Sequence, residues 1–226
     1  MGQESLIRRE LPSPDQASDP LLTKPGSNEP GACALASMLP PALMTELRTD
    51  HAGESGAVMI YRGILAVARD HGLRTFASHH LSTESRHLDF IEQIIPASRR
   101  SILLPLWRAA GWLTGALPAL AGERAVYATI QAVETFVDRH YAQQIEWIDR
   151  RLKQQQTTEN SSEPLAEELV VLLSVRERLE LCRLDEVSHR DDAADRWSGN
   201  VGMLLAGWLF CVSAGSDAAV RISRKL

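Results

Sequence analysis

Cysteine is scarce in this chain of 226 residues, and its few copies form no motif. Cys33, Cys182 and Cys211 are far apart, and no Cys-x-x-Cys is present. This spacing excludes a small disulfide-stabilised scaffold and a rubredoxin-type iron site, because both need clustered cysteines. The cysteine usage favours a reducing compartment.

Basic residues are too few to make the chain positive overall. Lysine and arginine number 24 against 29 aspartates and glutamates, and the formal net charge is -5. Binding to nucleic-acid phosphates requires a basic face. Nucleic acid is therefore not expected as a partner.

Long uninterrupted apolar runs are also missing. The first thirty residues have no continuous apolar core of the kind that a secretory signal needs, and their acidic side chains do not fit a mitochondrial presequence. The sequence therefore indicates the bacterial cytoplasm as the protein's location.

Two shorter apolar segments remain. Residues 101–122 contain two prolines, two tryptophans and a single charged side chain, Arg108. This stretch is too interrupted for a membrane span, which needs about 20 apolar residues. It is expected to be an interfacial segment, the wall of an apolar channel, or a buried connection. Residues 197–216 carry no charge and indicate a fifth helix, buried or membrane-facing, before a basic end.

Against this background, one pattern occurs twice: a lone glutamate followed further along the chain by Glu-x-x-His. The two copies consist of Glu54 with Glu84 and His87, and Glu134 with Glu186 and His189. Residues three apart on an α-helix project from one face, so four packed helices would direct four carboxylates and two imidazoles to one place. This is the ligand set of ferritin-like di-metal bundles, and it favours iron or manganese over structural zinc. The alternative is that these side chains lie on solvated helix faces.

Small and aromatic residues accompany the lone glutamates. Gly53 and Gly56 flank Glu54, which indicates close approach of a neighbouring helix or a ligand, or else ordinary tight helix packing. Tyr61 and Tyr141 each follow a lone glutamate by seven residues, and so lie two turns along on nearly the same face.

The helix signals predict an all-α fold, namely a ferritin-like four-helix bundle with additional C-terminal and connecting helices. The four bundle helices are expected over residues 42–70, 73–95, 123–153 and 164–196, and Gly72 is expected to end the first.

The chain divides by composition into an arm and one domain. Residues 1–38, rich in proline, are expected to be disordered or loosely packed. Residues 39–226 are expected to form the di-iron bundle domain, with 154–163 as a polar linker inside it.

From about residue 47 to its C-terminus, the sequence resembles the demethoxyubiquinone hydroxylase family, the di-iron monooxygenases of ubiquinone biosynthesis. The resemblance rests on LRTDHAGESGAVMIYRG, ESRHLDF, PLWRAAGWLTGALPAL, AVETFVDRHYAQQI and DEVSHRDDA. It implies that the six glutamates and histidines bind two Fe ions, with Glu84 and Glu186 bridging. It also implies that His140 and Tyr141, which match a His-Tyr pair of the family, belong to the catalytic site.

The activity implied by the resemblance is O₂-dependent ring hydroxylation of a demethoxyquinone, with NADH as electron donor. The implied partners are a prenylated quinone, O₂, accessory proteins of ubiquinone biosynthesis, and the inner face of the cell membrane, bound peripherally. The sequence indicates no oligomeric state.

Two other functions stay open. One is a different ferritin-like di-iron oxidase or an iron-handling protein, because one fold supports several chemistries. The apolar segments favour the hydroxylase, since an iron-storage shell needs no lipid-facing entrance. The other is a metal-free helical interaction module.

Overall fold

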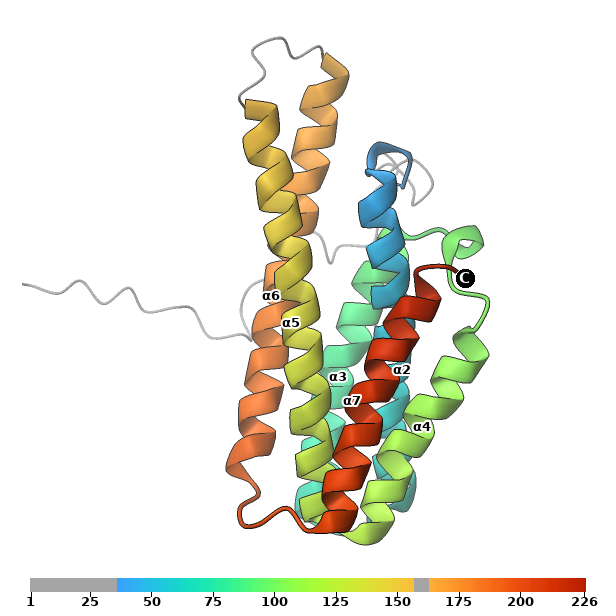
Figure 1. The fold of residues 1–226 in the computed structure, drawn as a ribbon, viewed down its shortest axis with the longest axis vertical. Coiled ribbons are helices and arrows are strands. Elements are labelled where there is room, and N and C mark those ends of the chain that lie inside the picture. Colours follow the sequence, from blue (N-terminus) through green and yellow to red (C-terminus); the bar gives the residue numbers. More distant parts are fainter. Residues whose placement is uncertain (1–35, 157–162) are drawn as a thin grey trace, which may run out of the picture. The chain divides into compact units, whose positions relative to one another are not determined.

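The computed structural model describes residues 36–156 and 163–226, and the regular structure in these ranges is entirely helical (Figure 1). The all-α class is therefore confirmed. Of the expected N-terminal arm, only residues 36–38 are described, and they are helical. The rest of the arm, and residues 157–162 of the expected linker, lie outside the described residues.

The first two long helices are α2 (Pro41–Val67) and α3 (His71–Ile94). A proline in the first turn of α2 suits its start, where the missing N–H has no partner to lose. The expectation that Gly72 ends this helix is wrong. Asp70 accepts a hydrogen bond from the Leu73 N–H at 2.8 Å, so α3 has already begun when Gly72 is reached.

Helix α4 (Leu104–Ala121) is continuous, which corrects the expectation of an interrupted segment. One of its prolines lies in the first turn, and the other, Pro118, lies in the last. After the helix, Gly122 adopts a φ of 113°, a value that favours glycine. The glycines of α4 bring it close to α2: a Cβ on Gly111 would lie 2.3 Å from the Gly56 carbonyl oxygen.

Helices α5 (Glu123–Gln156) and α6 (Glu163–Asp195) are the longest and run side by side (Figure 1). They contain 34 and 33 residues, against 27 and 24 in α2 and α3. The larger spacing between the second pair of glutamates therefore lies largely in longer helix ends. The described ends of the expected 154–163 linker belong to α5 and α6 themselves.

Helix α7 (Met203–Ser223) begins six residues later than expected, after a turn in which Gly199 has a φ of 100°. It packs against α5 and α2, and the Trp208 indole donates to Thr129 Oγ1 at 2.8 Å. Near the C-terminus, the Leu226 carbonyl accepts from the Ile102 N–H at 3.2 Å. Met203 and Leu204 are more than 90% exposed. Of the two alternatives for this helix, buried or membrane-facing, the exposure favours the second.

The core consists of two apolar clusters. One includes Leu47, Ile91 and Leu179, and the other includes Ile64 and Phe76. On each bundle helix the pattern glutamate lies between residues of the first cluster and residues of the second. The polar residues of the sequence pattern are therefore enclosed between two apolar layers.

Candidate metal centre

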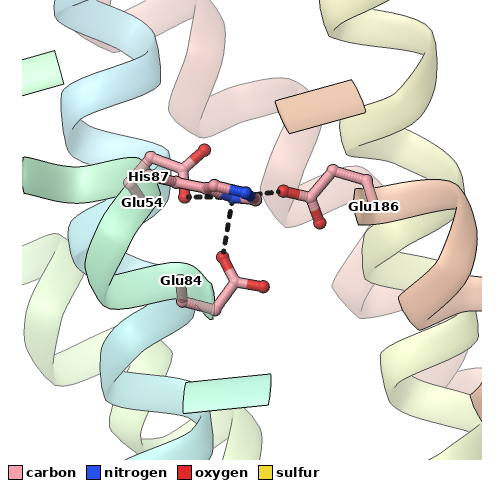
Figure 2. Close-up of side chains that lie close together, drawn as sticks. All are labelled: Glu54, Glu84, His87 and Glu186. Atoms are coloured by element: carbon pink, nitrogen blue, oxygen red, sulfur yellow. Dashed lines mark ion pairs between the residues drawn. The ribbon is translucent and has the colours of Figure 1, made fainter. Parts of the chain in front are cut away.

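The structure brings all six residues of the repeated pattern together inside the bundle. They come from α2 (Glu54), α3 (Glu84, His87), α5 (Glu134) and α6 (Glu186, His189), and none is more than 4% exposed. Figure 2 shows the carboxylates of Glu54, Glu84 and Glu186 gathered around the ring of His87. The alternative of solvated helix faces is therefore wrong for these six side chains.

The two histidines share the two Glu-x-x-His carboxylates. Glu84 places Oε1 2.9 Å from His189 Nδ1 and Oε2 3.8 Å from His87 Nδ1. Glu186 places Oε1 3.0 Å from His87 Nδ1 and Oε2 3.6 Å from His189 Nδ1. Each of these carboxylates thus presents one oxygen to each histidine, which is the arrangement expected of a group that joins two ions.

The ligand atoms form two groups of four that share Glu84 and Glu186. One group adds Glu54 and His87, the other adds Glu134 and His189, and within each group the atoms lie within 4.8 Å of one another. Several of these buried atoms make no hydrogen bond of good geometry, including both oxygens of Glu186 and Nδ1 of both histidines. Buried polar atoms without partners are costly, and cations would satisfy them. The donor set of oxygen and imidazole nitrogen fits two iron ions.

The other ring nitrogen of His87, Nε2, also has a hydrogen-bond partner. Its Nε2 lies 3.0 Å from Asp185 Oδ2, an acid that the sequence places one residue before Glu186. A carboxylate at Nε2 fixes the orientation of the imidazole and leaves Nδ1 free to bind a metal. Asp185 is about half exposed, so this support comes from the surface side of α6.

The pKa values of the cluster reflect four buried carboxylates that lie close to one another and to two imidazoles. Burial, reinforced by neighbouring carboxylates, raises the pKa of Glu54 and Glu134 well above the ordinary range. Burial opposes the charging of His189, but the close approach of the Glu186 and Glu84 carboxylates raises its pKa to about 9. Burial also acts against the ionisation of Glu186, yet its proximity to both histidines lowers its pKa. The metal-free site therefore retains protons that bound cations would replace.

Tyr141 contacts the cluster through a glutamate on another helix. Its hydroxyl donates to Glu54 Oε1 on α2 rather than to Glu134, the glutamate seven residues before it on α5. The equivalent tyrosine of α2, Tyr61, donates to Glu134 Oε1 at 2.9 Å. Sequence spacing indicated that the tyrosines face the bundle interior, but the exchange of partners depends on packing.

His140 is not part of the carboxylate cluster. Its Nε2 lies 3.1 Å from Asp50 Oδ1 and 3.0 Å from Thr49 Oγ1. Gln144 donates to the same Asp50 oxygen at 2.6 Å. The predicted catalytic pair is therefore divided: Tyr141 touches a pattern glutamate, and His140 belongs to a neighbouring polar group that the sequence did not reveal.

His80 also lies beside the site. It is buried, its Nε2 is 3.0 Å from Asp192 Oδ2, and its ring packs edge-on against His189 with 4.1 Å between centroids. Burial and the adjacent His189 lower its pKa to about 4. No glutamate lies three residues before this histidine, so no pattern in the sequence marks it as part of the site.

An apolar cavity of about 430 Å³ leads to the cluster. Its walls come from α2, α4, α5 and α7, and include Gly53, Trp107, Gly111, Trp208 and Val212. Glu54, Glu84, Glu134, Glu186 and Tyr141 line it as well. Of the alternatives for residues 101–122, the channel wall is thus correct. Of the two glycines beside Glu54, Gly56 lies against α4, whereas a Cβ on Gly53 would meet no atom within 4 Å.

Comparison with known proteins gives the family. Residues 41–223 match the model of the ubiquinone biosynthesis protein COQ7 family. The chain is 40% identical to the 3-demethoxyubiquinol 3-hydroxylase of Rhodospirillum rubrum over 109 residues, about half of each protein (46% and 51%). It is 29% identical to the mitochondrial NADPH-dependent 3-demethoxyubiquinone 3-hydroxylase of Mus musculus, over 79% of this chain and 76% of that protein.

The family match extends over all the helices that supply the six residues, and the buried glutamates and histidines are consistent with the di-iron site of a ferritin-like monooxygenase. The chain belongs to the COQ7 family of ubiquinone biosynthesis, the demethoxyubiquinone hydroxylases.

Proposed function

We propose that this chain hydroxylates the ring of a demethoxyubiquinone intermediate with O₂ at a di-iron centre. The observation that carries the proposal is the buried cluster of four glutamates and two histidines at the inner end of an apolar cavity. A metal site reached through an apolar cavity suits a reaction on a hydrophobic substrate.

The six residues divide into bridging and terminal ligands. Glu84 and Glu186 would each bridge two irons, because each has one oxygen beside either histidine. Glu54 with His87, and Glu134 with His189, would complete the two sites. Irons held by carboxylates in this way supply O₂ activation.

The protein contributes access and exclusion of water. The quinone ring would lie in the cavity beside Tyr141 and the carboxylates, and the prenyl tail would leave between α4 and α7 along Trp107 and Trp208. A largely apolar wall keeps water from the reacting ring and thereby limits side reactions. The Tyr141 side chain lines the cavity and its hydroxyl donates to Glu54, and His140 borders the same cavity from the polar group around Asp50.

A second, polar cavity supports a reduced nicotinamide nucleotide as electron donor. It has a volume of about 370 Å³ between α5 and α7, and Arg139, Arg221 and Arg224 line it with Asp217 as the only acid. Arginines suit the phosphates of such a donor. Phe136, His140 and Val220 line both cavities, so the donor would lie next to the quinone. The family resemblance implies NADH, whereas the mouse relative is named for NADPH.

Exposed apolar residues support peripheral membrane binding. They lie on α4 (Leu106, Leu113, Leu117) and on α7 (Met203, Leu204, Phe210), two of the helices that border the cavity. By length and composition, α7 alone among the described helices could cross a membrane. Its other face lines the cavity and packs on α5, which favours a helix lying in the interface over a span.

The decisive assay supplies demethoxyquinone, a reduced nicotinamide nucleotide and ¹⁸O₂. We expect one labelled oxygen in the quinone by mass spectrometry. NADH and NADPH, tested in parallel, identify the donor. Label found only in water, with the quinone unchanged, would transfer the chain to the oxidase class.

Tyr141→Phe tests the role of the cavity tyrosine. We expect slower hydroxylation with iron content retained, because the hydroxyl is not one of the six metal ligands. His189→Ala should reduce both iron content and turnover. Equal loss of iron in both variants would remove the proposed role of Tyr141.

A further inference from the structure

Two hydrogen bonds cross the bundle in opposite directions. Tyr61 on α2 donates to Glu134 on α5, and Tyr141 on α5 donates to Glu54 on α2. In both cases the acceptor is Oε1 of a glutamate that belongs to only one group of ligands. Each terminal glutamate thus has one oxygen occupied by a phenol.

Glu84 and Glu186, the glutamates shared by both groups of ligands, differ in their hydrogen bonds. No tyrosine hydroxyl among the described residues donates to Glu84 or Glu186, and both oxygens of Glu186 lack a hydrogen bond of good geometry. Glu54 has one oxygen on a tyrosine and the other, Oε2, unpartnered. The tyrosines therefore distinguish carboxylates that offer one oxygen from carboxylates that offer two.

Tyr61 lies among buried aromatic rings. It is fully buried, and its ring is stacked on His80 with 5.7 Å between centroids. His80 is itself fixed by Asp192 and by an edge contact of 4.3 Å with Phe76. Tyr61 does not border the apolar cavity, whereas Tyr141 does. Its hydroxyl is consequently directed at Glu134 and shielded from substrate.

We propose that Tyr61 is a positioning residue that keeps Glu134 a one-oxygen ligand and so preserves an open coordination position on the ion beside His189. Without the phenol, Glu134 Oε1 would be a buried oxygen in need of a partner, and the nearest cation would provide one. The inference rests on the proposed function only in taking iron as the metal.

Tyr61→Phe tests the inference, and Tyr127→Phe is the matched control. Tyr127 is a buried tyrosine of the same apolar cluster that packs edge-on against Phe76, away from the six pattern residues. Magnetic circular dichroism of the diferrous protein reports the coordination number of each iron. We expect Tyr61→Phe to keep its iron, to gain one ligand on one iron, and to lower kcat about tenfold with KM for the quinone within about twofold. Tyr127→Phe should leave the spectrum unchanged.

Glu134→Gln provides the rescue test. An amide has one oxygen able to bind the metal, so in the Glu134→Gln background Tyr61→Phe should add no ligand. An unchanged spectrum in Tyr61→Phe, or a gain that persists in the double variant, overturns the inference.

The unaltered protein gives an independent reading should Tyr61→Phe not fold. Infrared difference spectra between metal-free and iron-loaded protein should show one-oxygen coordination for the terminal glutamates, and a chelating signature would refute the proposal. These readings do not depend on hydroxylation, so failure of the proposed reaction and failure of this inference are separate results.

Discussion

At the scale of single residues, the site is notable for the number of ionisable groups that it buries together. Four carboxylates and two imidazoles share a space without solvent, and burial disfavours each charge. In the metal-free chain the pKa values of Glu54, Glu134 and the two histidines are raised, so each of these groups binds its proton more tightly than it does in the unfolded chain. Cation binding must therefore release protons.

The stability of the metal-free protein should fall between pH 6.5 and pH 9. The glutamates with raised pKa values and both histidines bind protons more tightly folded than unfolded, so their contribution is complete at low pH and is lost as the pH rises. The raised pKa of His189, about 9 against 6.5, alone corresponds to a loss of about 3 kcal/mol. Glu186, with a lowered pKa, is ionised throughout this window and adds no slope.

Thermal unfolding at the two pH values, with and without anaerobic Fe(II), measures the effect. Iron should abolish most of the fall, because it replaces the protons. A melting temperature of the metal-free protein that rises from pH 6.5 to pH 9 would contradict this account.

Removing a bridging carboxylate should empty the site. We expect Glu186→Ala to reduce iron from about two atoms per chain to well below one, since both predicted ions lose a ligand. Circular dichroism should show the helix content retained. Glu146→Ala, which removes an exposed glutamate of α5, is the control and should keep its iron. Equal iron content in the two variants would disprove the assignment.

Sequence reasoning reached the six clustered residues because Glu-x-x-His is a local pattern, read within one helix. It did not reach the crossed tyrosine bonds, the Asp50–His140 contact or the His80–Asp192 contact. Each of these contacts joins residues on two different helices, between 73 and 112 positions apart. Such contacts depend on the rotation of packed helices, which spacing along one helix does not determine.

At the scale of elements, the contact between α2 and α4 depends on glycine. A Cβ on Gly115 would lie 1.9 Å from the Ile60 carbonyl oxygen, and one on Gly63 would lie 2.2 Å from that of Trp112. The sequence predicted close approach around Glu54, but the interruption it predicted in α4 does not occur. Prolines in the first and last turns of α4 make its sequence look interrupted, but at these positions they do not break the helix.

Gly115→Ala should therefore destabilise the protein, by about 1–3 kcal/mol for a forced shift of packed backbone. Gly53→Ala is the matched control, because a Cβ there meets nothing within 4 Å, and it should be neutral or stabilising by up to about 1 kcal/mol. Denaturant unfolding of both variants measures the difference. A Gly115→Ala protein as stable as Gly53→Ala would mean that the helices separate at little cost.

At the scale of the whole bundle, the cavity and the exposed apolar surface share the same two helices. The faces of α4 and α7 that point away from the cavity expose large apolar side chains to solvent. The C-terminal end of the chain contains Arg221, Arg224 and Lys225. The sequence identified both segments by composition. It did not show that they border one cavity, because residues 104–121 and 203–223 are separated by the whole of α5 and α6.

This arrangement makes membrane binding depend on α7 in particular. Leu204→Asp places a charge at a position that is 93% exposed, so the fold should tolerate it, while insertion of that face into lipid should not. Val170→Asp is the matched control on α6, a helix that contributes only Glu186 to the lining of the cavity, and the Val170 side chain is 67% exposed. In flotation with anionic liposomes, we expect the unaltered protein and Val170→Asp to float and Leu204→Asp to remain largely at the bottom. High salt should release only part of the bound protein, because contact between apolar groups and lipid is not screened. If Leu204→Asp floats as well as Val170→Asp, α7 is not the membrane-binding element, and the route proposed for the prenyl tail fails with it.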